Sequence, residues 1–233
     1  PNGSILGVAG NVNVQRVVDQ ADRLFGAWKP VETAPVVRGS RGARIDHIPH
    51  DSQQTQIALA YDAVPYSHPD YYTAWAAVSV LSGGSSSRLF TEVREKRGLC
   101  YTVYATLNSL LTEGRVFCYA GTTSERAQET LDVTLSDIER LSEGIAEDEL
   151  ERSTARAKST LVMQQESTGA RAGALARDWF HLGRVVPLEE VRARIDALTP
   201  EQVGSYARTH PPRDVTVLTI GPEPLDVPDQ SPN

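Results

Sequence analysis

Two runs rich in Tyr, Val, Thr and Phe, residues 100–107 and 115–120, are separated by a turn region that contains Glu113-Gly114. β-Branched and aromatic residues favour strands, and two such runs around a short turn are typical of a hairpin. A hairpin pairs its strands antiparallel. This feature therefore excludes an all-helical fold and a purely parallel sheet, and every other element has to be arranged around it.

The rest of the chain alternates between extended and helical patterns. Apolar or alternating runs predict strands over residues 4–10, 54–61 and 215–221. Apolar residues at three-to-four spacing predict helices over residues 14–28, 67–82, 87–96, 122–141, 147–165, a further stretch ending near 179, 187–198, and from 199 onward. The mixture predicts the α+β class, an antiparallel sheet with helices packed on it.

Polar residues at the helix ends predict where several helices begin and stop. Thr122 with Glu125, and Thr199 with Gln202, have the spacing of a capping box, in which each side chain bonds the backbone N–H of the other. The segment 67–70 offers an N-cap, an early Pro and an acidic first turn. Gly98 is the expected stop of the helix over residues 87–96.

Composition suggests where the domains divide. Residues 29–44 are rich in Pro, Gly and charge without any period, so we predict a linker there. Residues 1–28 then form the last strand and helix of a preceding, similar half, residues 45–225 form the main domain, and residues 226–233 form a tail. The apolar runs before Gly10 and Gly221 resemble each other, as in a protein of two related halves. The chain starts at Pro1, so we interpret it as a fragment or a processed form.

Charge and composition exclude several classes of protein. The 23 Lys and Arg against 30 Asp and Glu give a net charge of −7, which disfavours nucleic-acid binding. No apolar run approaches the ~20 residues that a membrane span requires, so we expect a soluble protein, and the cytoplasm and the periplasm both stay open. Cys100 and Cys118 lie on neighbouring predicted strands, as a facing pair or, as we expect, as two half-buried thiols.

The histidines do not make a recognisable metal site. Zinc peptidases place two His one helical turn apart, and only His47 and His50 come close to that spacing. Pro49 lies between them and breaks any helix, so we interpret this segment as an exposed approach to the first strand. We expect no metal bound by this chain.

A Gly-Ser loop, Ser82-Gly83-Gly84-Ser85-Ser86-Ser87-Arg88, precedes the helix over residues 87–96. Free N–H groups at a helix start can bind an anion. However, the loop follows a helix, lacks the Lys of a phosphate loop, and has Ser87 where a Gly-x-Ser-x-Gly pattern needs Gly. We predict a helix-to-helix turn, with an anion-binding module as a weaker alternative.

Arg94 and Tyr101 are seven residues apart, at the end of this helix and the start of the following strand. Taken alone, such residues are ordinary. Arg94 would complement the helix dipole, and Tyr101 would be a strand aromatic with its hydroxyl at the rim.

The same region resembles the carboxy-terminal domain of the pitrilysin superfamily, which includes insulin-degrading enzyme and the mitochondrial processing peptidase. The likeness is carried by LSGGSSSRLF (81–90) and VREKRGLCY (93–101), and it continues in the strand-helix opening at 8–25, in QES with Arg171 and LGR (182–184), and in LTPE (198–201). The resemblance covers nearly the whole chain in the right order.

This resemblance implies one half of a two-domain, clam-shell metallopeptidase fold. The other half, on the same chain or on a partner subunit, would hold zinc in an inverted His-x-x-Glu-His motif, which this sequence lacks. Arg94 and Tyr101 match the pair with which such a domain reaches the bound peptide. The resemblance thus implies substrate binding by Arg94 and Tyr101, no catalytic residue in this chain, and no activity without the zinc-bearing half.

Two functions follow from the sequence. The first is a component of a zinc metalloendopeptidase that binds and orients a peptide substrate; the second is a non-catalytic structural or interaction subunit of the same superfamily. The Arg94 and Tyr101 pair favours the first, since a scaffold has no need of it. An isolated half would leave an apolar face uncovered, so we also expect that it can form a homodimer.

Overall fold

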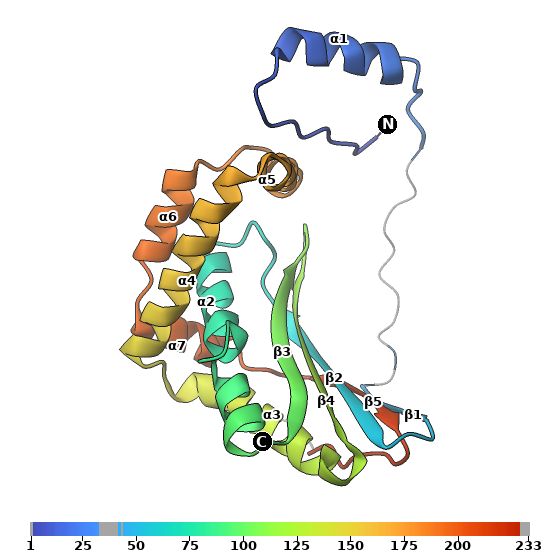
Figure 1. Cartoon of the computed structure of the whole chain (residues 1–233), viewed down its shortest axis with the longest axis vertical. Helices are drawn as coiled ribbons and strands as arrows, with labels where there is room; N and C mark the ends of the chain where they lie inside the picture. Colours follow the sequence, from blue (N-terminus) through green and yellow to red (C-terminus); the bar gives the residue numbers. More distant parts are fainter. Residues whose placement is uncertain (1, 33–41, 43, 229–233) are drawn as a thin grey trace.

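One five-stranded sheet organises the fold. The computed structural model describes residues 2–32, 42 and 44–228, and its strands lie in the order β1-β5-β2-β4-β3 (Figure 1). The strands are β1 (Ile45–Pro49), β2 (Gln54–Ala63), β3 (Cys100–Ser109), β4 (Gly114–Thr123) and β5 (Thr216–Gly221). From β5 to β3 all neighbours are antiparallel, and β3 and β4 form the predicted hairpin. The α+β class is confirmed.

Strand β1 was not predicted, and it makes the sheet mixed. It pairs parallel with β5, with Ile48 opposite Ile220. Ile45 and Ile48 are exposed, and Pro49 ends the strand. No local pattern indicates β1 because its hydrogen-bonding partner lies some 170 residues later, and edge strands tolerate Pro and exposed positions.

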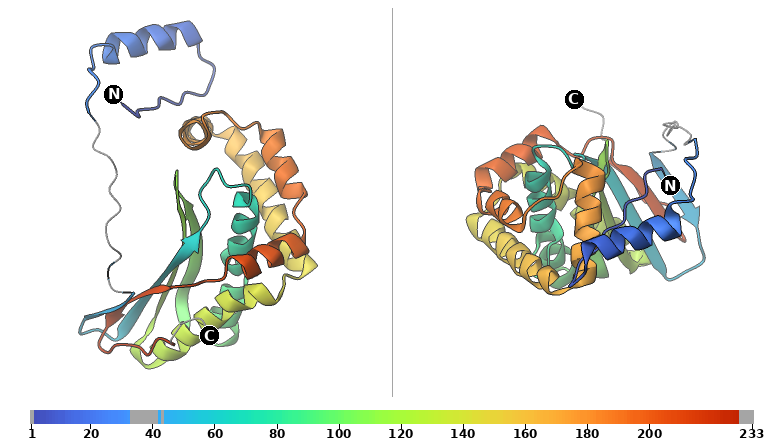
Figure 2. Two further views of the ribbon diagram at one scale, coloured as in Figure 1. Left: turned by 180° about the vertical axis from the view of Figure 1, so that it is seen from behind. Right: turned by 90° about the horizontal axis from the view of Figure 1, so that it is seen from above.

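The helices lie mainly on one side of the sheet (Figure 2). They are α1 (Val14–Phe25), α2 (Tyr71–Ser82), the π-helix η1 (Phe90–Lys96), the 3-10 helix η2 (Ser124–Arg126), α3 (Ala127–Glu139), the 3-10 helix η3 (Arg140–Glu143), α4 (Glu147–Glu166), α5 (Thr168–Leu182), α6 (Leu188–Asp196) and α7 (Pro200–Thr209). Helices α2 and α3 contact the sheet, and α4 and α7 pack on α2. Within the described residues, no helix is both long and apolar enough to cross a bilayer.

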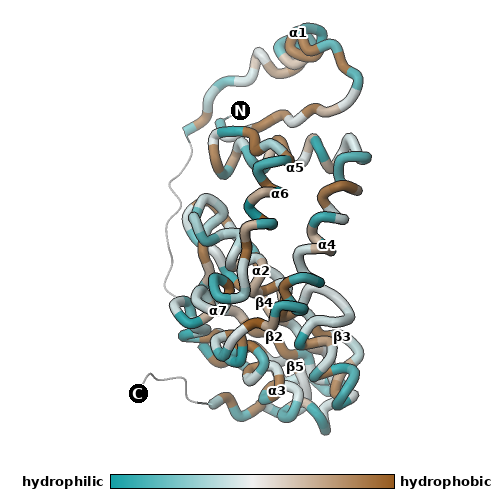
Figure 3. The backbone as a smooth tube through the Cα atoms, turned by 90° about the vertical axis from the view of Figure 1, so that its left-hand side faces the viewer, coloured by the Kyte–Doolittle hydropathy of each residue, from teal (hydrophilic) through white to brown (hydrophobic). Residues whose placement is uncertain are grey.

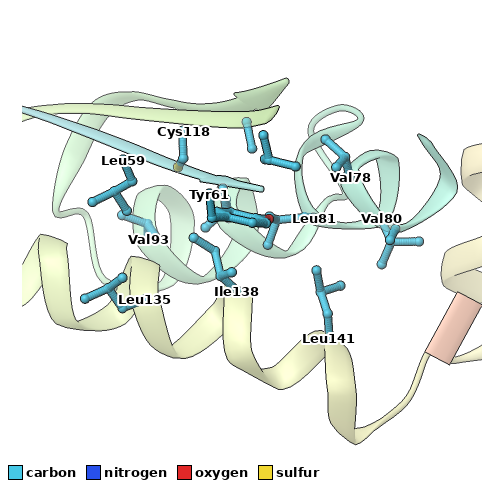
Figure 4. Close-up of a cluster of buried hydrophobic side chains, with 14 of the residues drawn as sticks. Leu59, Tyr61, Val78, Val80, Leu81, Val93, Cys118, Leu135, Ile138 and Leu141 are labelled. Atoms are coloured by element: carbon cyan, nitrogen blue, oxygen red, sulfur yellow. The ribbon is translucent and has the colours of Figure 1, made fainter. Parts of the chain in front are cut away.

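The core lies between the sheet and α2 with α3 (Figure 4). Burial alternates along β2, where Ile57, Leu59 and Tyr61 face the helices while Ala58 is exposed. Helix α2 is buried nearly all round and is rich in alanine, which lets it approach the sheet closely. The opposite face of the sheet is open, and Phe117 is 45% exposed there. The described residues thus form two layers with one uncovered sheet face.

The predicted helix caps had mixed outcomes. The box at α7 is confirmed, since Thr199 Oγ1 accepts from the N–H of Gln202 at 3.3 Å and Gln202 Oε1 accepts from the N–H of Thr199 at 3.1 Å. The box at Thr122 is wrong. Thr122 belongs to β4, where its hydroxyl donates to the carbonyl of Leu99 at 2.6 Å. The helix after 67 begins at Tyr71, and Asp70 makes no side-chain cap bond.

The N-terminal region stands apart from the core (Figures 1 and 3). Helix α1 is confirmed, with Asn13 as its N-cap, but none of its residues is buried. The predicted strand at 4–10 is not formed, because among the described residues no strand lies beside it to pair with. Instead Gly7 lies against α5, so close to the carbonyl of Ala172 that a Cβ would be 2.3 Å from it. Residues 33–41 and 43 of the predicted linker and 229–233 of the predicted tail lie outside the described residues.

Candidate functional site

Helix η1 carries Arg94. Leu89 and Val93 are fully buried and fix one side of this helix against the core, which leaves Arg94 on the partly exposed side. The helix is stopped by Gly98, whose φ of +59° suits a residue without a Cβ. The N–H of Gly98 donates to the carbonyl of Arg94 at 3.1 Å. The predicted stop at Gly98 is confirmed, whereas the π-helical geometry was not foreseen.

Tyr101 lies at an irregularity in β3. Cys100 pairs with Thr122 and Thr102 with Gly121, so Tyr101 is an extra residue with no opposite number on β4, a β-bulge. Because of this extra residue, the core side of β3 is formed by Cys100 before the bulge and by Val103 and Ala105 after it. The Tyr101 side chain is 82% exposed. Bulges commonly redirect a side chain in this way.

The structure brings Arg94 and Tyr101 together. The guanidinium carbon of Arg94 lies 5.0 Å from the centre of the Tyr101 ring and 4.8 Å from the centre of the Phe90 ring. These distances are those of cation–π contacts. Among the described residues, no hydrogen bond or ion pair engages the Arg94 guanidinium, so its N–H donors are available to a ligand.

The residues around this pair carry charges of both signs. Lys96 pairs with Glu92 at 2.6 Å, and Arg97 lies 3.7 Å from Glu129. Arg126 donates to the carbonyl of Gly98 at 2.5 Å. Since Lys96 and Arg97 also stand at this helix end, the helix dipole alone does not require an arginine at position 94. Positive charge and exposed donors together suit the carbonyl or carboxylate oxygens of a peptide.

The Gly-Ser loop is a helix-to-helix turn, as predicted. Two of its four hydroxyls are hydrogen-bonded within the protein, since Ser82 Oγ accepts from the N–H of Ala105 at 2.8 Å and Ser87 Oγ donates to the carbonyl of Gly84 at 2.6 Å. The loop ends at Arg88, which donates to both carboxylate oxygens of Glu149 at 2.7 Å. Sequence reasoning missed this role of Arg88, which ties the start of the site helix to α4.

Among the described residues, the histidines and cysteines do not form a metal-holding cluster. His47 Nδ1 lies 2.8 Å from Thr219 Oγ1, a contact between neighbouring strands β1 and β5. Throughout the part of the chain that the structure describes, no three His, Cys, Asp or Glu side chains are placed to share a metal ion. Cys100 and Cys118 are free, buried thiols, and burial raises the pKa of both.

Two grooves of the described part of the molecule lie away from the pair. The larger one, about 680 Å³, runs between α2, α4, α5 and the 105–109 stretch of β3, and neither Arg94 nor Tyr101 lines it. A second groove of about 460 Å³ separates the N-terminal segment from α5. Arg94 and Tyr101 therefore meet on an open surface, which a second surface would have to cover to make a chamber.

Comparison with known proteins identifies the class. The model of the family described as "Peptidase M16 inactive domain" matches residues 1–156, and the chain belongs to this family. The name marks it as the part of an M16 peptidase that does not perform the catalysis.

Relatives agree with this assignment. An uncharacterized zinc protease from Rickettsia felis is 29% identical over 94% of this chain and 54% of its own length. An uncharacterized zinc protease from Streptomyces coelicolor is 29% identical over 95% of this chain and 50% of its own length. The chain thus spans about half the length of the curated relatives it matches.

A solved structure of a peptidase M16 inactive domain from Pseudomonas fluorescens superposes with a TM-score of 0.81, at 25% identity, over 94% of this chain and 53% of that one. The periplasmic protease PqqL of Escherichia coli shares the fold over 92% of this chain and 25% of that one, with a TM-score of 0.68 at 18% identity. These likenesses confirm the fold that the resemblance implied.

Proposed function

We propose that this chain is the half of a zinc metalloendopeptidase that does not bind the metal, and that Arg94 and Tyr101 bind and orient the peptide substrate. The observation that supports this most is their geometry: side by side, exposed, and with the guanidinium donors unused by the described residues. A guanidinium and a phenol can both donate to peptide carbonyls, which fixes the register of an extended substrate. The same donors can stabilise negative charge on the carbonyl oxygen during attack.

The second half of the chamber would come from the zinc-bearing half, as part of the same protein or as a partner subunit. Zinc bound there would supply Lewis-acid activation of the attacking water. Two features of this chain suit such a partner. The sheet has an uncovered face, and the apolar side chains of residues 5–8 and of α1 are exposed. We assign residues 1–28 to the end of the zinc-bearing half, which would precede the main domain. A homodimer through the same apolar surface is the competing arrangement.

The test compares peptide cleavage by the complete protein, this chain together with its zinc-bearing half, in two pairs of variants. Arg94→Ala should lower kcat/KM about 10- to 100-fold, since hydrogen bonds to a charged group contribute about 1.5–3 kcal/mol. Tyr101→Phe should lower it about 3- to 10-fold, because a neutral hydrogen bond contributes less.

Matched controls are Arg152→Ala, an exposed arginine of α4, and Tyr206→Phe, a half-buried tyrosine of α7. Both should cleave normally. Chelation of zinc should stop cleavage without changing the melting temperature of this chain. Normal cleavage by both Arg94→Ala and Tyr101→Phe would refute the proposed role.

The second candidate is a structural or interaction subunit. A chain of complex III2 from Candida albicans has the same fold, with a TM-score of 0.72 at 20% identity, and shows that the fold occurs within a larger assembly. The exposed pair at Arg94 and Tyr101 favours the peptidase. The second candidate would be favoured if the complete protein bound no zinc and cleaved no peptide, but formed a stable complex with other chains.

A further inference from the structure

Phe90 is the one ring of the site helix, and the core does not account for it. Its neighbours Leu89 and Val93 are fully buried, whereas Phe90 is only half-buried. Among the described residues, Phe90 belongs neither to the core cluster nor to the partly buried side chains that pack on it. A large aromatic side chain at this position therefore needs another explanation.

The explanation lies in its contact with Arg94. The guanidinium carbon is 4.8 Å from the centre of the Phe90 ring and 5.0 Å from that of Tyr101, so two rings flank one planar cation. A guanidinium that stacks on a ring keeps its N–H donors free in its own plane. Since no ion pair with a described residue holds Arg94, these rings are what limits the rotation of its long side chain.

We infer that Phe90 is a positioning residue, which holds the Arg94 guanidinium in the orientation that the peptide site requires. The inference rests on the proposed function of Arg94 and adds a residue that the family assignment does not name. It predicts that an aromatic ring at position 90 is required, and not merely an apolar side chain of similar volume. Tyr101 cannot replace Phe90, because its own side chain is 82% exposed and, under the proposed function, would contact the substrate.

The first measurement observes Arg94 directly, without any substrate. In the ¹⁵N-labelled 233-residue chain, the Nε–Hε resonance of Arg94, assigned by its loss in Arg94→Lys, reports ring-current shift and side-chain motion. Phe90→Leu should remove much of the shift and lower the heteronuclear NOE. Phe90→Tyr should keep both, as should the control Phe180→Leu, the same change at a half-exposed phenylalanine of α5. If Arg94 is as rigid in Phe90→Leu as in the parent chain, the inference is wrong.

The second measurement is peptide cleavage by the complete protein, well below its melting temperature. Phe90→Leu should lower kcat/KM about 3- to 10-fold, the range expected for a lost cation–π contact. Phe90→Tyr should restore cleavage, and Phe180→Leu should leave it unchanged. A rescue by tyrosine separates positioning from a merely structural role, since both variants alter the packing.

The two measurements separate the failure of this inference from the failure of the proposed function. Suppose that Arg94→Ala impairs cleavage, while Phe90→Leu makes Arg94 mobile without impairing cleavage. The positioning role of Phe90 is then overturned, and the proposed peptide site stands. If Arg94→Ala itself has no effect, the proposed peptide site fails, and the NMR result alone decides whether Phe90 holds the guanidinium.

Discussion

The contact of Arg88 with Glu149 gives the sharpest test of what holds the site helix in place. The Nε and Nη2 atoms of Arg88 donate to the two carboxylate oxygens of Glu149, both at 2.7 Å. Its Nη1 atom donates to the carbonyl of Arg140 at 3.0 Å, and Nη2 also donates to the carbonyl of Gly144 at 2.7 Å. The two charged side chains are only 15% and 20% exposed. Arg88→Ala would therefore leave a shielded carboxylate and two carbonyls without this donor.

The size of the effect follows from that shielding. Removing one partner of a fully buried ion pair costs about 3–5 kcal/mol, and the residual exposure of this pair places Arg88→Ala at the lower end, about 3 kcal/mol. For a chain of this length, 1 kcal/mol shifts the melting temperature by about 2–4 °C. Thermal unfolding followed by circular dichroism should show a decrease of about 6–12 °C.

Two further variants make the comparison specific. Arg88→Lys keeps the charge but loses the two-pronged contact, so it should fall between the parent chain and Arg88→Ala. Arg152→Ala removes an equally short pair, 2.6 Å to Asp148, that is exposed on α4. Exposed pairs one helical turn apart contribute about 0.3–0.5 kcal/mol. If Arg88→Ala and Arg152→Ala melt at the same temperature, the reasoning from burial is wrong.

The same contact predicts a pH dependence. Burial alone would raise the pKa of Glu149, but the hydrogen bonds from Arg88 and from the N–H of Ala146 outweigh it and hold the pKa below its usual value. The stability that this ion pair contributes is therefore present above the unfolded-state pKa of about 4.3 and is lost as the pH falls through the lower, folded-state value. The melting difference between the parent chain and Arg88→Ala should shrink from pH 7 to pH 3. A difference that stays constant would contradict this assignment.

Two other predictions follow from backbone conformation and from burial. Gly98→Ala forces an L-residue into φ +59° and should lower the free energy of unfolding by about 1 kcal/mol, although the added Cβ would meet nothing closer than 3.7 Å. The control Gly169→Ala, at a glycine without a positive φ, should not destabilise the chain. Equal melting temperatures of the two variants would refute the argument. Burial raises the pKa of Cys118 to about 12 and also raises the pKa of Cys100. Ellman's reagent, used without any reductant, should therefore label neither thiol in the native chain and both thiols in the chain unfolded by urea. Rapid labelling of the native chain would show that the strands carrying them open.

The sequence predicted those parts of the fold that are encoded locally. The hairpin, the long helices and the stop at Gly98 all follow from patterns a few residues long, and each is present. Strand β1 was missed because its pairing with β5 is non-local. The cap at Thr122 was wrong because a buried strand uses that hydroxyl to bond Leu99, a tertiary contact that overrides the local motif.

The site was predictable only in part, for a related reason. The spacing of Arg94 and Tyr101 is visible in the sequence, but their contact depends on a π-helix and a β-bulge, and neither has a local signature here. Phe90 does stand four residues before Arg94, a spacing at which helical side chains can meet. That signal was present in the sequence, and the apolar periodicity of the helix concealed it.

The unpaired residue in β3 also determines which changes this region can tolerate. Seven steps of chain separate the guanidinium from the phenol, and they include a left-handed glycine and one residue that the partner strand does not match. Adding or deleting a single residue there would either remove the bulge or shift the register of the following strand by one residue. After such a shift the side chains of the strand would exchange faces, and Tyr104 would point into the core. Many substitutions in this segment can therefore be accepted, but its length cannot change. In a distant relative, the number of residues between the two positions is a better indicator of a retained contact between the arginine and the tyrosine than the identity of the residues between them.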